Sequence, residues 1–102
     1  MLEFARPDVF GRRREPPGVI VGEAKTRWDI EVGHTQTQLV CYFDYLKEEV
    51  NGELWLAVPW AGLDAMYFYA GRCRRLSSAQ HIPFQVTGVA LEAPLFSRTV
   101  RA

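Results

Sequence analysis

The segment from Gly18 to Thr26 constrains the fold most, because it is apolar on both of the faces that a β-strand presents. Val19 and Val21 lie on one face and Ile20 on the other, since successive side chains of a strand point to opposite sides. Strands of this kind lie inside a sheet and are buried on both faces. A second segment of the same character runs from Leu54 to Val58. The sequence therefore predicts two buried internal strands.

The residues around these strands predict how they are connected. Glu15-Pro16-Pro17-Gly18 favours a loop, so residues 2–12 are expected to form an extended arm that pairs with the first strand as a hairpin. Thr35 to Val50 is expected to be an amphipathic helix that ends at Asn51-Gly52. Its core stripe consists of Leu39, Phe43, Leu46 and Val50. A strand, a helix and a second buried strand predict a right-handed parallel crossover.

The remainder of the chain predicts one more helix and one more strand. The helix is expected from Leu63 to Leu76 and the strand from Phe84 to Ala90. The predicted fold class is α/β, with a mixed β-sheet, flanking helices and the element order β-β-α-β-α-β in a single domain over residues 1–102.

Large side chains surround the second expected helix. Met66 to Tyr69 are consecutive, so they cannot all face one sheet. A domain of this size also has a small core. We therefore expect a homodimer that uses this helix together with Trp60 or Trp28.

The charges of the chain cancel. With 12 basic and 12 acidic residues, it lacks the positive excess that is typical of nucleic-acid-binding proteins. Any nucleic-acid contact must then be local, and the dense basic groups are Arg12 to Arg14 and Arg72 to Arg75. Each group also fits a structural role, as a solvated turn or as the last turn of a helix.

Targeting signals and cysteine chemistry are not evident. No apolar run approaches the length of a membrane helix and the N-terminus lacks the apolar core of a signal peptide, so we expect a cytoplasmic protein without a membrane partner. Cys41 and Cys73 lack the spacing of a zinc site and are expected to be small apolar fillers rather than a disulfide.

Asp8 and Glu23 are expected to be neighbours across the predicted hairpin. Opposed residues of an antiparallel pair have numbers of constant sum, and the sum of 31 puts the hairpin centre between Glu15 and Pro16. The two Cβ atoms would then lie about 4.5–5.5 Å apart. Lys25, two residues after Glu23, shares their face. A hard divalent cation would remove the repulsion between two carboxylates at this separation.

These residue types suit phosphodiester hydrolysis. Acidic ligands hold Mg²⁺, which neutralises phosphate charge and activates water, and an ammonium group stabilises the additional charge of the transition state. Simpler interpretations remain open: Glu23 and Lys25 can form an ion pair at the strand end, and Asp8 can be a turn residue after proline. The chain has no phosphate-binding glycine loop, no nucleophile elbow and too few histidines for a zinc hydrolase.

The spacing of these residues resembles a known motif. Pro7-Asp8, a gap of fourteen residues and Glu23-Ala24-Lys25 look like the defining motif of the PD-(D/E)XK nuclease superfamily, which has the restriction-endonuclease-like fold. Gln38 and Tyr42 resemble the Gln-xxx-Tyr element of its RecB-like branch. The stretch from Val19 to Pro59 also looks like small prokaryotic or phage members of the superfamily, and the resemblance covers about residues 5–90.

The resemblance implies a metal-dependent deoxyribonuclease. Asp8, Glu23 and the Ala24 carbonyl would ligate Mg²⁺ or Mn²⁺. Lys25 would orient the nucleophilic water, and Gln38 would support the site from the helix. The implied partner is DNA, and its expected contacts are Arg12, Arg13, Arg14 and Tyr42.

One part of the family pattern has no counterpart in this chain. Members usually carry a helix before the first strand, often with an additional acidic ligand, whereas only six residues precede Pro7 here. The expected core therefore lacks this helix, and the acidic residues left as further ligand candidates are Glu3, Asp29 and Glu31. A non-catalytic structural or nucleic-acid-binding module of the same fold is the alternative to the nuclease.

Some residues of the expected site also fit structural roles. Thr35 and Gln38 fit a capping box at the start of the helix. Tyr42 lies at the margin of the apolar stripe and fits the core. His34, just before the expected helix, fits a loop or capping residue better than a general base.

Overall fold

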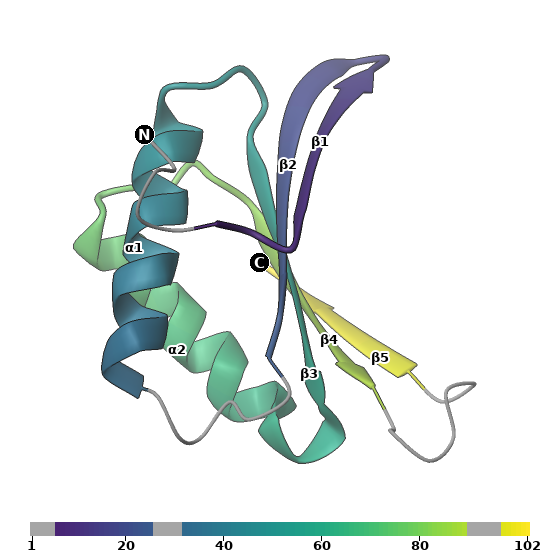
Figure 1. Ribbon diagram of the computed structural model, residues 1–102, viewed down its shortest axis with the longest axis vertical. Coiled ribbons are helices and arrows are strands. Elements are labelled where there is room, and N and C mark those ends of the chain that lie inside the picture. Colours follow the sequence, from purple (N-terminus) through teal and green to yellow (C-terminus); the bar gives the residue numbers. More distant parts are fainter. Residues whose placement is uncertain (1–5, 26–31, 90–96) are drawn as a thin grey trace.

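The chain forms one five-stranded sheet with two α-helices packed on it (Figure 1). The computed structural model describes residues 6–25, 32–89 and 97–102. In chain order the elements are β1 (Val9–Arg14), β2 (Pro17–Ala24), α1 (Val32–Lys47), β3 (Glu53–Pro59), the 3-10 turn η1 (Trp60–Gly62), α2 (Leu63–Leu76), β4 (Phe84–Val89) and β5 (Ser97–Arg101). None of the described helices is long and apolar enough to cross a membrane.

The sheet is mixed, so the predicted α/β class is confirmed. Its strand order is β1-β2-β3-β4-β5. The three central strands are parallel to one another, and β1 and β5 pair antiparallel at the two edges. The sequence pattern does not predict β5, because Val100 is the single apolar residue of that strand. β5 is identified as a strand by its antiparallel pairing with β4 and not by an alternation of apolar residues.

The hairpin of β1 and β2 has the predicted register. Val9 opposes Gly22 and Phe10 opposes Val21, and the turn between the strands lies at Glu15-Pro16. Each opposed pair therefore sums to 31. The ladder begins at Val9, so Asp8 directly precedes it at the end of β2.

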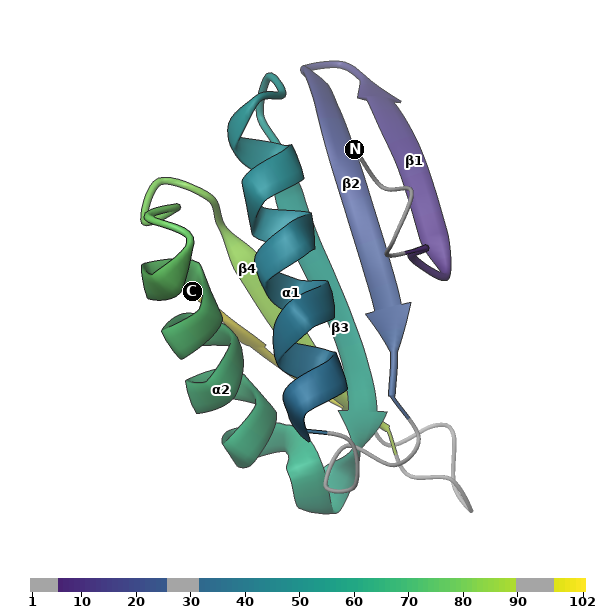
Figure 2. The same cartoon turned by 60° about the vertical axis from the view of Figure 1, so that its left-hand side comes forward.

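Both helices lie on the same face of the sheet (Figures 1 and 2). α1 connects β2 to β3 and α2 connects β3 to β4. Two crossovers with the same handedness that proceed in the same direction along a sheet place their helices on the same face of that sheet. Between the layers lies a core that includes Val19, Val21, Leu39, Phe43, Leu46, Leu54, Leu56, Val58, Met66, Phe84 and Val86.

The other face of the sheet carries no helix in the part of the chain that the structure describes. Trp55 on β3 is 43% exposed, and Ile20 on β2 is half-buried. The prediction that these strands are buried on both faces is therefore wrong, although both are internal. On this face Gly22 lies against Val9 of the neighbouring strand. The described apolar residues of this face therefore pack against residues of the same sheet and not against a second layer.

Helix α1 begins earlier than predicted. Its first residue is Val32, so Thr35 lies inside the helix and is buried, and the predicted capping box at Thr35 is wrong. The helix ends at Lys47, and Val50 beyond it is 68% exposed. The predicted stripe is therefore right over its first three members and wrong at Val50.

Helix α2 has the predicted bounds and turns one large side chain outward. Met66 is buried and Tyr67 packs against Phe84, whereas Phe68 is 73% exposed. A homodimer formed through this helix stays a prediction. Trp28, its other proposed contact, lies outside the described residues.

Replacing Leu46 should destabilise the fold far more than replacing Val50. Leu46 is fully buried, so Leu46→Ala is expected to lower the free energy of unfolding by about 2–5 kcal/mol. Val50→Ala is expected to change it by less than about 0.5 kcal/mol, because the side chain is exposed. Urea denaturation followed by circular dichroism measures both, and equal losses would contradict the helix register.

Candidate functional site

Asp8 and Glu23 meet at one end of the hairpin. Asp8 directly precedes Val9, which opposes Gly22, and Glu23 directly follows Gly22 on the face that carries the helices. The carboxyl group of Asp8 lies close enough to that of Glu23 to raise its pKa. The Oδ2 atom of Asp8 also accepts a hydrogen bond from the backbone N–H of Ala24, at 2.8 Å. The structure therefore brings the two acidic residues together at this end of the hairpin, and the predicted separation of their Cβ atoms stays a prediction.

Glu23 is a buried carboxyl group held by helix α1. It is only 8% exposed, and Tyr42 donates a hydrogen bond to its Oε1 at 2.6 Å. Burial raises the pKa of Glu23, and the hydrogen bond and negative charge of Asp8 raise it further. The Tyr42 hydrogen bond and the positive charge of Lys25 oppose this increase. Burial also raises the pKa of Tyr42, so the phenol remains a protonated donor.

Lys25 lies beside the carboxylates and is oriented by the same helix. Its ammonium group donates a hydrogen bond to Oε1 of Gln38. Gln38 and Tyr42 are four residues apart, so both lie on one side of α1. The backbone N–H of Lys25 donates to the carbonyl of Ala57 at 2.9 Å, which fixes the end of β2 to β3.

The oxygen donors at this end of β2 fit a divalent cation. The N–H of Ala24 is directed to β1 while that of Lys25 is directed to β3, and a residue's C=O lies on the same side of a strand as its N–H. The Ala24 carbonyl is therefore directed to the side of Asp8. Two carboxylates and one carbonyl suit Mg²⁺, whose remaining positions are commonly filled by water and phosphate oxygen. No cluster of three or more His, Cys, Asp or Glu side chains occurs among residues 6–25, 32–89 and 97–102.

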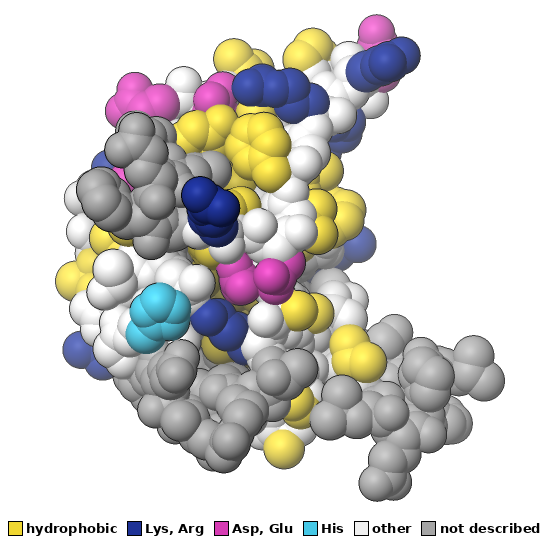
Figure 3. All heavy atoms as spheres, in the orientation of Figure 1, with side chains coloured by type: hydrophobic (Ala, Val, Ile, Leu, Met, Phe, Trp, Pro, Cys, Tyr) yellow, Lys and Arg dark blue, Asp and Glu magenta, His cyan; other side chains and the backbone are white. Residues whose placement is uncertain are grey.

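A hollow of about 390 Å³ lies on the open face of the sheet at this end of β2. Its lining includes Asp8 and Glu23 together with Trp55 and Ala57, although the Glu23 carboxyl group is directed to the helix side. In the view of Figure 3, acidic side chains lie next to each other near the centre of the molecule, with a basic side chain close by. Of the two acidic residues, Asp8 is exposed and Glu23 is buried.

The three consecutive arginines of β1 do not act as one group. Arg12 opposes Val19 and so lies on the helix side, with Arg14 on the same side. Arg13 lies on the other side, where it forms an ion pair with Glu53 at 2.7 Å and donates to the Pro16 carbonyl at 3.1 Å. Arg13 therefore has a structural role in the fold, and a nucleic-acid contact by this residue stays a prediction.

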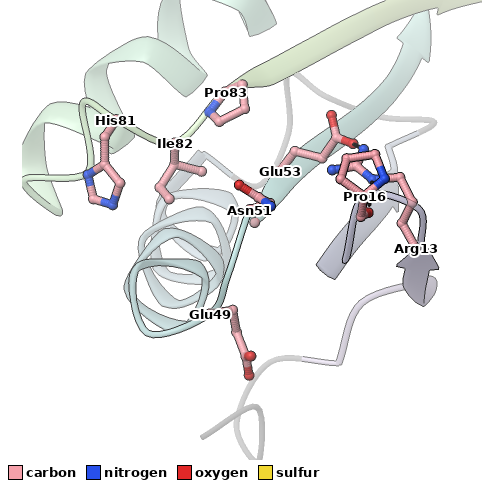
Figure 4. Close-up of a pocket in the computed structure, with 9 residues that line it drawn as sticks. Arg13, Pro16, Glu49, Asn51, Glu53, His81, Ile82 and Pro83 are labelled. Atoms are coloured by element: carbon pink, nitrogen blue, oxygen red, sulfur yellow. Dashed lines mark hydrogen bonds and ion pairs between the residues drawn. The ribbon is translucent and has the colours of Figure 1, made fainter. Parts of the chain in front are cut away.

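Figure 4 shows Arg13 at a second hollow, at the end of β2 remote from the carboxylates. This hollow has a volume of about 540 Å³. Arg13, Pro16 and Glu53 lie together on one side of it, and His81 lies on the other (Figure 4). The ion pair joins β1 to β3 across the intervening strand, which is a structural function.

Two other predicted roles change with the structure. Tyr42 is fully buried, so it cannot contact a nucleic acid directly and instead supports Glu23. His34 lies in the first turn of α1 and is exposed, one turn before Gln38. The further ligand candidates Glu3, Asp29 and Glu31 lie outside the described residues.

Sequence reasoning overlooked Phe10. It lies two residues after Asp8 on the same side of the hairpin and is 46% exposed. The alternation of Asp8, Phe10 and Arg12 along β1 is the signal that indicates a shared face.

Comparison with known proteins adds no family assignment. No protein-family model matches the chain, and searches of the curated proteins and of the solved structures give no match.

The raised pKa of Glu23 predicts how the stability of the metal-free protein depends on pH. A carboxyl group that binds its proton more tightly when folded stabilises the fold below its unfolded pKa, near 4.5, and this contribution disappears as the pH rises through the folded value. The wild-type chain should therefore lose stability relative to Glu23→Gln as the pH is raised above about 4.5. Urea denaturation in EDTA across this range measures the difference. Glu48→Gln, which removes an exposed carboxylate, is the control, and parallel curves for wild type and Glu23→Gln would contradict the prediction.

Proposed function

We propose that the chain is a metal-dependent nuclease that hydrolyses phosphodiester bonds in DNA. The observation that carries this proposal is the contact between the carboxyl groups of Asp8 and Glu23, with Lys25 beside them. Two ionised carboxylates this close repel, and the arrangement becomes favourable when a cation lies between them. Lys25 supplies a positive charge that is oriented toward the same place.

The fold supports the same proposal. A hairpin followed by a helical crossover to a parallel strand holds the motif residues at the end of β2, as in the restriction-endonuclease-like core that the sequence resembles. Helix α1 crosses the site with Gln38 and Tyr42, which hold Lys25 and Glu23 respectively. We propose this core, without the N-terminal helix of the family, as the scaffold of the nuclease.

Each residue of the proposed site has a distinct role. Asp8, Glu23 and the Ala24 carbonyl hold Mg²⁺ or Mn²⁺, which when bound polarises the phosphate and lowers the pKa of water. Lys25 orients the attacking water and stabilises the charge that develops on the phosphate. Gln38 keeps the Lys25 ammonium in place, since it accepts a hydrogen bond from it. Arg12 and Arg14 contact the phosphates of DNA on the same side of β1.

Lys25→Ala and Glu23→Gln are expected to abolish metal-dependent cleavage. Each should lower the rate of nicking of supercoiled plasmid by about 10²–10³-fold, because a group that stabilises the transition state is removed. Nicking is measured with Mg²⁺ or Mn²⁺, and EDTA should stop it.

Two controls make this cleavage test specific. Glu48→Gln removes an exposed carboxylate outside the site and should cleave as the wild type does. Equal nicking by all variants and in EDTA would come from a contaminant and would remove the support for the proposal.

A non-catalytic nucleic-acid-binding or structural module is the second candidate. It is favoured by the presence of only two clustered carboxylates in the part of the chain that is described. Calorimetric titration with Mn²⁺ separates the two functions. The nuclease requires binding at millimolar concentration or tighter that is lost in Asp8→Asn, whereas the module requires none. Wild-type protein that binds no metal and cuts no nucleic acid would favour the module.

A further inference from the structure

The side of β1 that carries Asp8 continues with three residues suited to a nucleic acid. Phe10, Arg12 and Arg14 follow at every second position and oppose residues of β2 on the helix side. We refer to these three residues as the β1 track. At the rise of an antiparallel strand, they lie about 7, 14 and 20 Å from Asp8 along the strand. The track therefore leads from the tip of the hairpin to the carboxylate pair.

Phe10 is an aromatic ring held at the surface. Its ring centroid is 5.8 Å from that of Tyr45 on α1, at an interplanar angle of 57°. The guanidinium of Arg12 lies 5.8 Å from the Phe10 centroid. With these contacts the side chain is still 46% exposed. Phe10 thus contacts both Tyr45 and Arg12 and remains partly exposed to solvent.

The two arginines of the track keep their charge available. Both are exposed, and within the described residues neither has an ion-pair partner. Arg13 between them is neutralised by Glu53 on the opposite side of the sheet. The alternation of β1 therefore gathers unneutralised positive charge on the side that carries Phe10.

We propose that the β1 track binds single-stranded DNA and leads the strand to Asp8 and Glu23. A base stacks on Phe10, and Arg12 and Arg14 bind successive phosphates. This assignment rests on the proposed nuclease function and specifies its substrate as a single strand.

The exposed ring is what favours a single strand over a duplex. Proteins that bind single strands combine a positive groove with aromatic side chains on which unstacked bases lie. In a duplex the base faces are already stacked, and the phosphate contacts of a duplex need arginine but no aromatic ring. A ring between a carboxylate and two arginines therefore fits an unpaired strand.

Fluorescence anisotropy in EDTA tests the track without cleavage or metal. A labelled oligothymidylate should bind more tightly than a labelled duplex. Phe10→Leu should weaken oligothymidylate binding about fivefold or more and leave duplex binding nearly unchanged, because a base loses its stacking surface. Arg12→Gln with Arg14→Gln should weaken binding and lower the slope of log K against log salt by about 0.7 per lost contact.

Matched variants on α2 control for the loss of an exposed ring or charge. Phe68→Leu and the pair Arg72→Gln, Arg75→Gln alter exposed residues outside the track and should leave binding unchanged. Because Phe10 also packs against Tyr45, Phe10→Tyr is the second variant: it keeps the ring and should keep the affinity.

The outcomes separate the track from the nuclease. Equal or weaker binding of the single strand relative to the duplex, no binding, or equal losses in Phe10→Leu and Phe68→Leu would overturn the track, even where metal-dependent nicking of plasmid persists. Tight oligothymidylate binding that depends on Phe10 supports the track, and its occurrence without any cleavage removes the nuclease instead.

Discussion

The register of the β1–β2 hairpin is the constraint on which the site depends. A shift by one residue would move Asp8 to the opposite face of the sheet from Glu23. The turn at residues 15–16 sets the register at one end. Gly18 secures it there, because a Cβ at this position would lie 2.8 Å from the carbonyl oxygen of Asn51. Backbone packing at the turn therefore determines the carboxylate contact at the other end of the strands.

Helix α1 lowers the free-energy cost of placing Glu23 in a buried position next to Asp8. Ionised Glu23 is disfavoured by desolvation and by Asp8, and a donor from Tyr42 lowers that cost. Gln38, one turn earlier, holds Lys25 in the same way. A helix that packs through its apolar stripe thus also presents two polar side chains at the edge of that stripe. The crossover between β2 and β3 is for this reason part of the site as well as part of the fold.

Much of this arrangement follows from local patterns, and the corrections follow from tertiary context. The sum of residue numbers across a turn predicts that Asp8 opposes Glu23, because antiparallel pairing is periodic. Periodicity cannot show whether a second layer covers the other face of the sheet. The partial exposure of Trp55 on that face was therefore not predicted. It likewise predicts an apolar margin at Tyr42 but not the hydrogen bond that the phenol makes. The separation of Arg13 from its neighbours is visible in the alternation of β1, but its partner Glu53 is forty residues away in sequence.

The neutral net charge of the chain is compatible with an electrostatic role for β1. The two carboxylates at the end of the hairpin repel a phosphate, so an approaching nucleic acid requires positive charge close by. Arg13 pairs with Glu53 on the other side of the sheet, and among the described residues of β1 the helix side carries the charges of Arg12 and Arg14, with Lys25 at the end of the neighbouring strand. Screening confines such charges to a range of about 8 Å at physiological salt, so their position matters more than the total over the chain. Strand alternation, which places Arg13 on the open face and Arg12 and Arg14 on the helix side, thus gives a local distribution of charge that the composition of the whole chain does not reveal.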